Sequence, residues 1–169
     1  MNEMKNLWSL KASEISKLYL SNEISLDEII NSVEERFNQV NPKINAIPES
    51  TFEYARKQAK LLDDNKKNNK PLGCLAGVPV TVKINTDQTG FASTNGLRLN
   101  KSLIAHKNST VVDNLEKAGA LIVGRTNTPA FSIRWFTNNS LHGHTFNPHN
   151  KNITPGGSSG GAASATASG

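Results

Sequence analysis

The segment from residue 78 to residue 123 restricts the fold more than any other feature of the sequence. Residues 78–84 read VPVTVKI, and their β-branched side chains predict a buried strand. Ser109 then precedes a helix that Gly119 ends, and residues 120–123 predict a second strand. A strand, a crossover helix and a second strand are typical of an α/β layered fold.

Three helices are expected before this unit, because apolar residues recur at helical spacing in each segment. They cover residues 9–20, 25–41 and 50–62. Ser25 and Glu28 form the Ser-x-x-Glu capping box that begins the second helix, and Pro42 is expected to end it. The polar residues 63–71 predict a loop, and none of these helices shows residues that suggest chemistry.

Composition excludes several classes of protein. Hydrophobic residues make up 36% of the chain and charged residues 20%, which is enough apolar material for a core. The net charge of +5 is spread thinly, so it predicts a solvated basic surface and no nucleic-acid partner. No stretch reaches the ~18–20 apolar residues of a membrane span, and residues 1–10 lack the apolar core of a secretory signal. We therefore expect a cytoplasmic protein without a membrane partner.

Cysteine and histidine usage argues against a metal centre. Cys74 is the only cysteine, which excludes a disulfide framework and a cysteine-based zinc site, and we expect it to be a small buried hydrophobe. His142, His144 and His149 lie close together in sequence but have no Asp or Glu among them. They are interpreted as surface or loop histidines.

Lys83 is the first residue that could carry chemistry, because it lies inside a predicted buried strand. A charged, unpaired lysine in such a place costs free energy. Its amine either reaches solvent at the surface or has a lowered pKa and can act as a general base. The residues around it leave both interpretations open.

The second candidate is the run PGGSSGG at residues 155–161, which begins a stretch of small residues. Phosphate binding at a helix N-terminus, a Gly-x-Ser-x-Gly nucleophile elbow at Ser158 and an amide-hydrolysing serine network with a lysine base all fit. A plain Gly/Ser loop fits as well. No Lys follows as a phosphate loop requires, and residues 147–154 do not resemble the strand that an elbow needs. Alanine in residues 162–169 favours a helix over a flexible linker, and we expect the chain to stop inside a larger fold.

Three segments together identify a resemblance: GVPVTVKIN at residues 77–85, VGRTNTPAF at 123–131 and NPHNKNITPGGSSGGAA at 147–163. In this order they resemble the amidase signature family. The resemblance implies N-terminal helices followed by the first strands of a mixed sheet flanked by helices. Residues 1–169 would be the N-terminal part of a single amidase domain, with a helical lead-in at 1–62 and the start of the catalytic core at 72–169.

The resemblance also assigns roles to residues. The family hydrolyses amides to a carboxylate and ammonia or an amine with a Ser–cis-Ser–Lys triad, and it uses no cofactor and no metal. Lys83 matches the catalytic lysine, and Ser158 matches the bridging serine, whose peptide bond to Gly157 is cis. The nucleophilic serine belongs to a later glycine-rich turn, which the resemblance places beyond Gly169. The 169-residue chain alone is therefore expected to be inactive.

The main interpretation is a stand-alone amidase that acts on a small-molecule amide, and other interpretations stay open. One is an amidotransferase A-type subunit that serves tRNA-bound glutamate, although Ile84 stands where many members have an acidic residue. Another is an inactive remnant or binding module. A homo-oligomer is compatible with the sequence. Asn127 is expected to pack behind the lysine region, and Trp135 and Phe136 are expected in the core instead of a substrate wall.

Overall fold

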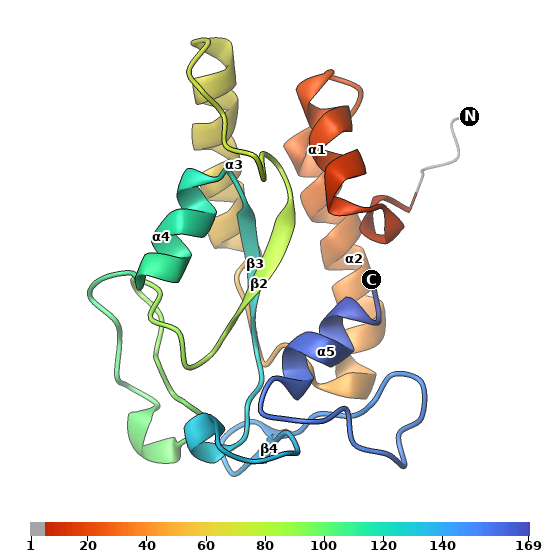
Figure 1. Ribbon diagram of the computed structural model, residues 1–169, viewed down its shortest axis with the longest axis vertical. Helices are drawn as coiled ribbons and strands as arrows, with labels where there is room; N and C mark the ends of the chain where they lie inside the picture. Colours follow the sequence, from red (N-terminus) through yellow and green to blue (C-terminus); the bar gives the residue numbers. More distant parts are fainter. Residues whose placement is uncertain (1–5) are drawn as a thin grey trace.

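A three-stranded mixed sheet lies at the centre of the computed structural model, which describes residues 6–169 (Figure 1). Residues 1–5, on which part of the expected helical lead-in and the expectation about a secretory signal fall, lie outside the described residues. The strands are β1 (Glu49–Ser50), β2 (Pro79–Lys83) and β3 (Leu121–Thr126), in the order β1-β3-β2. β2 and β3 are parallel and β1 is antiparallel to β3, so the expected α/β fold with a mixed sheet is confirmed.

Helices cover both faces of the sheet because side chains alternate along β3. Leu121 and Val123 pack in one core with the helices α1 (Ala12–Leu20), α2 (Leu26–Ile44) and α3 (Phe52–Lys67). Ile122, between them, packs with Val112 of α4 (Thr110–Lys117) in a second, smaller core. Figure 1 shows α4 on one side of the two longer strands and α1 and α2 on the other.

The start of α2 is as predicted, but its end is not. The Ser25 hydroxyl accepts from the Glu28 backbone N–H at 3.2 Å, and the Glu28 carboxylate accepts from the Ser25 N–H at 2.7 Å, which confirms the capping box. The helix does not end at Pro42 but continues to Ile44. Asn41 explains the difference, because its side-chain oxygen accepts from two backbone N–H groups just beyond the helix, at 3.0 and 2.9 Å.

α3 also runs further than predicted, because residues 63–67 continue it instead of forming a loop. These polar residues have partners on α1. The Tyr19 hydroxyl donates to Asp63 at 3.1 Å, and the Lys66 amine lies 4.1 Å from the centre of the Tyr19 ring. Tertiary contact with α1 therefore keeps helical a segment whose composition is typical of a loop.

Short elements fill the rest of the described chain. They are the 3-10 helices Leu7–Ser9, Arg98–Asn100 and Ala130–Ser132, the hairpin strands β4 (Asn138–Asn139) and β5 (Gly143–His144), and the helix α5 (Gly160–Thr166). α5 confirms the expected helix in the small-residue stretch. A side chain at Gly161 would approach the Asn127 and Ala46 carbonyls to 2.6 and 2.8 Å, so only glycine allows α5 to pack this closely.

One prediction about the core is wrong. Cys74 is exposed, because it begins the turn before β2, and Ala76, two residues later, is the residue that is fully buried. No helix within residues 6–169 is long and apolar enough to cross a membrane.

Candidate active site

The fold brings Lys83 and Ser158 into direct contact, although 75 residues separate them in the sequence. Lys83 is the last residue of β2. Its Nζ donates a hydrogen bond to the Ser158 Oγ at 2.8 Å and a second one to the Ser159 Oγ at 3.2 Å. The two candidate residues taken from the sequence therefore form one site at the carboxyl end of a parallel strand.

Burial lowers the pKa of Lys83 below its ordinary value. A half-buried amine loses part of the hydration that stabilises its charged form, so the neutral form becomes more accessible. Neutral lysine has a free electron pair and can take a proton from a hydroxyl group. The contact with Ser158 supplies such a hydroxyl within hydrogen-bond distance.

The turn that carries Ser158 is held by hydrogen bonds to Thr137 on both sides of it. The peptide bond between Gly157 and Ser158 is cis. The Thr137 hydroxyl donates to the Gly156 carbonyl at 3.0 Å and accepts from the Gly160 N–H at 3.0 Å. β5 ends at His144, and no strand lies between β5 and this turn in the described chain. The nucleophile elbow therefore lacks the strand that it requires.

Asn127 is fully buried beside this turn and takes part in a polar network. Its side-chain oxygen accepts from Asn139 at 2.7 Å and from the Thr128 N–H at 2.9 Å. Its amide nitrogen donates to the Thr145 hydroxyl at 3.0 Å. These bonds join the end of β3 to the β4–β5 hairpin, which agrees with the packing role expected for Asn127.

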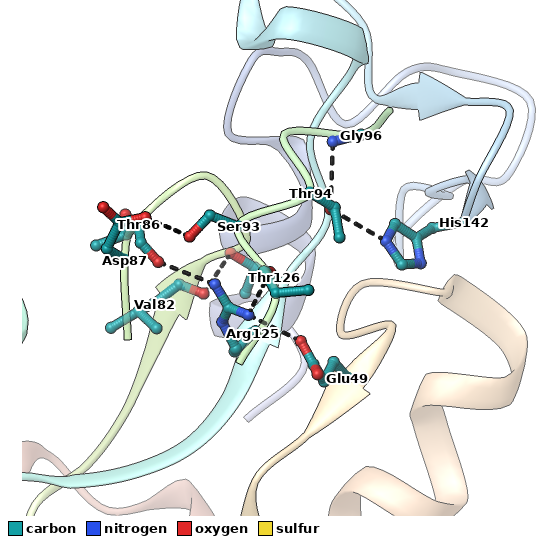
Figure 2. Close-up of polar contacts among 11 residues, drawn as sticks. Glu49, Val82, Thr86, Asp87, Ser93, Thr94, Gly96, Arg125, Thr126 and His142 are labelled. Carbon is teal, nitrogen blue, oxygen red and sulfur yellow. Dashed lines mark hydrogen bonds and ion pairs between the residues drawn. The ribbon is translucent and has the colours of Figure 1, made fainter. Parts of the chain in front are cut away.

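Arg125 is a buried cation that the sequence analysis did not single out (Figure 2). Its Nη1 donates to the Glu49 carboxylate at 3.0 Å and to the Ala92 carbonyl at 2.7 Å, and its Nη2 donates to the Thr86 carbonyl at 2.9 Å. Burial lowers the pKa of Arg125 and Glu49 opposes the shift, so the guanidinium remains charged. Arg125 thereby ties the loop that follows Lys83 to β1 and β3. The signal that could have found it is a charged residue inside the apolar run LIVGRT.

A family model described as Amidase matches residues 28–169. The chain belongs to the amidase signature family.

Individual relatives of this amidase-family chain have several activities. It is 44% identical over 163 residues to indoleacetamide hydrolase from Bradyrhizobium diazoefficiens, covering 96% of this chain and 31% of that protein. It is 40% identical to the A-type subunit of glutamyl-tRNA(Gln) amidotransferase from Fusobacterium nucleatum, covering 96% and 33%. A bacterial aryl acylamidase structure of the amidase signature family is 34% identical, with a TM-score of 0.87 over 92% of this chain and 32% of that one. The chain thus spans about a third of the length of these relatives.

Three of the four histidines, His142, His144 and His149, lie in or after the β4–β5 hairpin. His142 is half-buried, its Nε2 lies 3.4 Å from the Thr94 hydroxyl (Figure 2), and burial together with the charge of Arg125 lowers its pKa. His144 is half-buried in β5, and His149 is exposed in a loop. In the part of the chain that the structure describes, no group of three or more His, Cys, Asp or Glu residues could hold a metal ion.

The expectation for the two aromatic residues near the site is wrong. Trp135 is 87% exposed and Phe136 is 42% exposed, so neither belongs to the core. They lie in the segment between β3 and β4, whose backbone packs against the Ser158 turn at Gly157. In this segment the backbone makes that contact, and the side chains of Phe131, Ile133, Trp135 and Phe136 are exposed.

Proposed function

We propose that Lys83 and Ser158 are the base and the proton relay of an amide hydrolase, which converts a carboxamide to a carboxylate and ammonia or an amine. The observation that carries this proposal is the 2.8 Å hydrogen bond between the Lys83 amine and the Ser158 hydroxyl. The names of the relatives support an amide substrate, because two of the three are an indoleacetamide hydrolase and an acylamidase.

The proposed reaction begins with an attacking serine. In the family this serine belongs to a later glycine-rich turn, so we assign it to a part of the amidase domain outside residues 1–169. A serine hydroxyl is too weak an acid to react unaided and needs a base. Ser158 would accept its proton and pass its own to neutral Lys83 while the new bond to the substrate carbonyl carbon forms. The same route would return the proton to the nitrogen of the leaving amine as the amide bond breaks and leaves the acyl group on the serine oxygen. Water, deprotonated through the same relay, would then attack this ester, release the carboxylate and return a proton to the serine.

This assignment includes the wider predictions about the protein. We propose that residues 1–169 form the N-terminal part of one amidase domain, with the lead-in at 1–62 and the start of the catalytic core at 72–169. The substrate would be a small-molecule amide, with no nucleic acid as partner, and the location would be the cytoplasm. Lys83 and Ser158 need neither a metal nor a cofactor for the proton transfer described.

Substitution of Lys83 tests the proposal in a protein that contains the complete amidase domain. Lys83→Ala is expected to reduce amide hydrolysis by at least the ~10²–10⁴-fold contribution of a general base. Lys83→Arg should not restore activity, because a guanidinium stays protonated. Lys60→Ala, at an exposed position on α3, is the matched control and should keep full activity. Near-normal hydrolysis by Lys83→Ala or Lys83→Arg would contradict the assignment.

Residues 1–169 expressed alone provide a second test. We expect no measurable release of ammonia from simple amides, because Lys83 and Ser158 relay a proton but no attacking serine is present. Removing a nucleophile and the oxyanion donors beside it costs far more than the ~10²–10³-fold of a single donor. Turnover comparable to that of ordinary amidases would show that the functional unit lies within these residues.

A second candidate function is transfer of ammonia to tRNA-bound glutamate, as the name of the amidotransferase relative suggests. The 40% identity to that relative favours it. Ile84, fully buried directly after Lys83, stands against it, because many members have an acidic residue there. Hydrolysis of free amides without tRNA would support the stand-alone amidase, whereas ammonia production that requires charged tRNA would support the transferase. Failure of both assays would favour an inactive remnant or binding module.

A further inference from the structure

The segment between β3 and β4 wraps around the turn that carries Ser158. At one end of this segment, the Thr128 hydroxyl donates to the Ser158 carbonyl at 3.2 Å. At the other end, Thr137 donates to the Gly156 carbonyl at 3.0 Å. Between them, a Cβ placed on Gly157 would come within 2.6 Å of the Trp135 carbonyl carbon. The segment and the turn are therefore packed together as one unit.

Thr128 is itself held by a chain of polar groups. It is fully buried, and its hydroxyl lies 2.8 Å from the Ser132 hydroxyl, which donates to the Asn95 side-chain oxygen at 2.7 Å. Phe131 and Ser132 have positive φ values of 59° and 57°, a backbone conformation that residues with side chains rarely adopt. This unusual backbone directs the Ser132 hydroxyl toward Thr128.

Counting the hydroxyl hydrogens of these polar groups shows which residue can donate a hydrogen bond to the Ser158 carbonyl. Each hydroxyl has one hydrogen. The hydrogen of Ser132 goes to Asn95, so the Ser132 oxygen is left as an acceptor. The single hydrogen of Thr128 then lies between two acceptors, the Ser132 oxygen at 2.8 Å and the Ser158 carbonyl at 3.2 Å. Among these groups, only the Thr128 hydroxyl can donate to the Ser158 carbonyl.

We propose that Thr128 is a positioning residue that directs the Ser158 hydroxyl toward Lys83 by holding the Ser158 carbonyl. The close packing at Gly157 fixes the backbone before the Ser158 Cα, and Thr128 fixes the backbone after it. With both sides fixed, the direction of the Cα–Cβ bond of Ser158 is fixed as well. The role of Ser158 in the reaction rests on the function proposed above, but the positioning itself can be measured without turnover.

The test follows the reactivity of the Lys83 amine in the 169-residue chain. An amine-directed reagent labels neutral lysine, and mass spectrometry of the Lys83 peptide over a range of pH gives a midpoint that reports the pKa of Lys83. A hydroxyl that accepts from the ammonium stabilises the charged form, so loss of this contact shifts the midpoint to lower pH. Ser158→Ala measures the full shift for comparison.

Thr128→Val, which removes the hydroxyl but keeps the shape, is expected to reproduce at least half of the shift seen in Ser158→Ala. Thr128→Ser keeps the hydroxyl and should behave as the unmodified chain, and so should Ser132→Ala, because it leaves the donor to Ser158 in place. Thr51→Val is the matched control: Thr51 is also buried, and its hydroxyl donates to the Ile122 carbonyl at 2.7 Å, outside the polar network around Ser158. Thr128→Ala serves as the second hydroxyl-free variant if Thr128→Val does not fold.

Three results would overturn the inference. They are an unshifted midpoint in Thr128→Val and Thr128→Ala while Ser158→Ala shifts, an equal shift in Thr51→Val, or no shift in Ser158→Ala. In the complete amidase domain, Thr128→Val should lower kcat by about ten- to a hundredfold with KM unchanged, because small misplacements of reacting groups have effects of that size. A labelling shift in Thr128→Val together with full activity in Lys83→Ala would support the positioning and reject the proposed function.

Discussion

Residues 6–126 and residues 127–169 are stabilised in different ways. The main core of the first region is apolar and joins α1, α2 and α3 to one face of β3. In the second region most buried side chains are polar and hydrogen-bonded, namely Asn127, Thr128, Thr137, Asn139, Thr145, Ser164 and Ser168. Apolar packing has no preferred direction, whereas hydrogen bonds fix individual atoms. The helical scaffold therefore provides stability, and the polar region sets the geometry at Ser158.

Within the two regions, the segment between β3 and β4 and the helix α2 differ in what they expose. The segment between β3 and β4 exposes Phe131 (60%), Ile133 (77%) and Trp135 (87%), whereas the large apolar residues of α2 are buried or half-buried. Exposed side chains of this kind contribute little to the stability of the chain. This difference gives four predictions, which apply to the chain of residues 1–169.

The largest effect is expected in the scaffold. Ile29 of α2 is fully buried in the main core, so Ile29→Ala should lower the free energy of unfolding by about 2–5 kcal/mol. Chemical denaturation measures this loss. Under native conditions the pH midpoint for labelling of Lys83 should stay unchanged. A shifted midpoint would show that the scaffold and the site are not separable in this way.

The next effect tests the close approach of α5 to the polar region. Gly161→Ala places a methyl group against the backbone of Asn127, and overpacking of this kind costs about 1–3 kcal/mol. Because α5 follows directly on the Ser158 turn, the labelling midpoint of Lys83 should shift as well. Ala162→Gly, in the same helix, is the control and should leave the midpoint unchanged. An unshifted midpoint in Gly161→Ala would show that the packing of α5 does not affect the surroundings of Lys83.

A smaller loss is expected at the start of α2. Ser25→Ala removes the side chain that accepts from the Glu28 N–H, and loss of an N-cap costs about 1 kcal/mol. A thermal or denaturant melt measures it. Ser102→Ala, at an exposed position in the loop before α4, should change nothing measurable. Equal stability of the two variants would mean that tertiary packing alone holds the first turn of α2.

The smallest effect is expected at the exposed aromatic residue. Trp135→Ser should change the free energy of unfolding by no more than about 0.5 kcal/mol, as is usual for surface substitutions. Denaturation of both forms at equal concentration measures this difference. A loss of several kcal/mol would show that Trp135 is packed against the chain in solution and would weaken the contrast between the two regions.

Local signals in the sequence predicted much of the fold correctly. The capping box at Ser25, the strand–helix–strand unit and the helix in the small-residue stretch depend on neighbouring residues, and all three are confirmed. One error was local, because Pro42 remains helical while the neighbouring Asn41 side chain accepts from the backbone just beyond the helix. The other arose where a distant residue decides, because Tyr19 of α1 provides partners that keep the end of α3 helical.

The sequence by itself determined the resemblance to the family, the strand–helix–strand unit and the two residues, Lys83 and Ser158, that the resemblance assigns to chemistry. These follow from periodicity and from short motifs, which are local properties of the chain. Only the tertiary structure decided that the two side chains meet, that Arg125 ties down the loop after Lys83, and that Thr128 donates to the Ser158 carbonyl. Each of these contacts joins residues at least 30 positions apart, and no local pattern encodes the distance between such atoms.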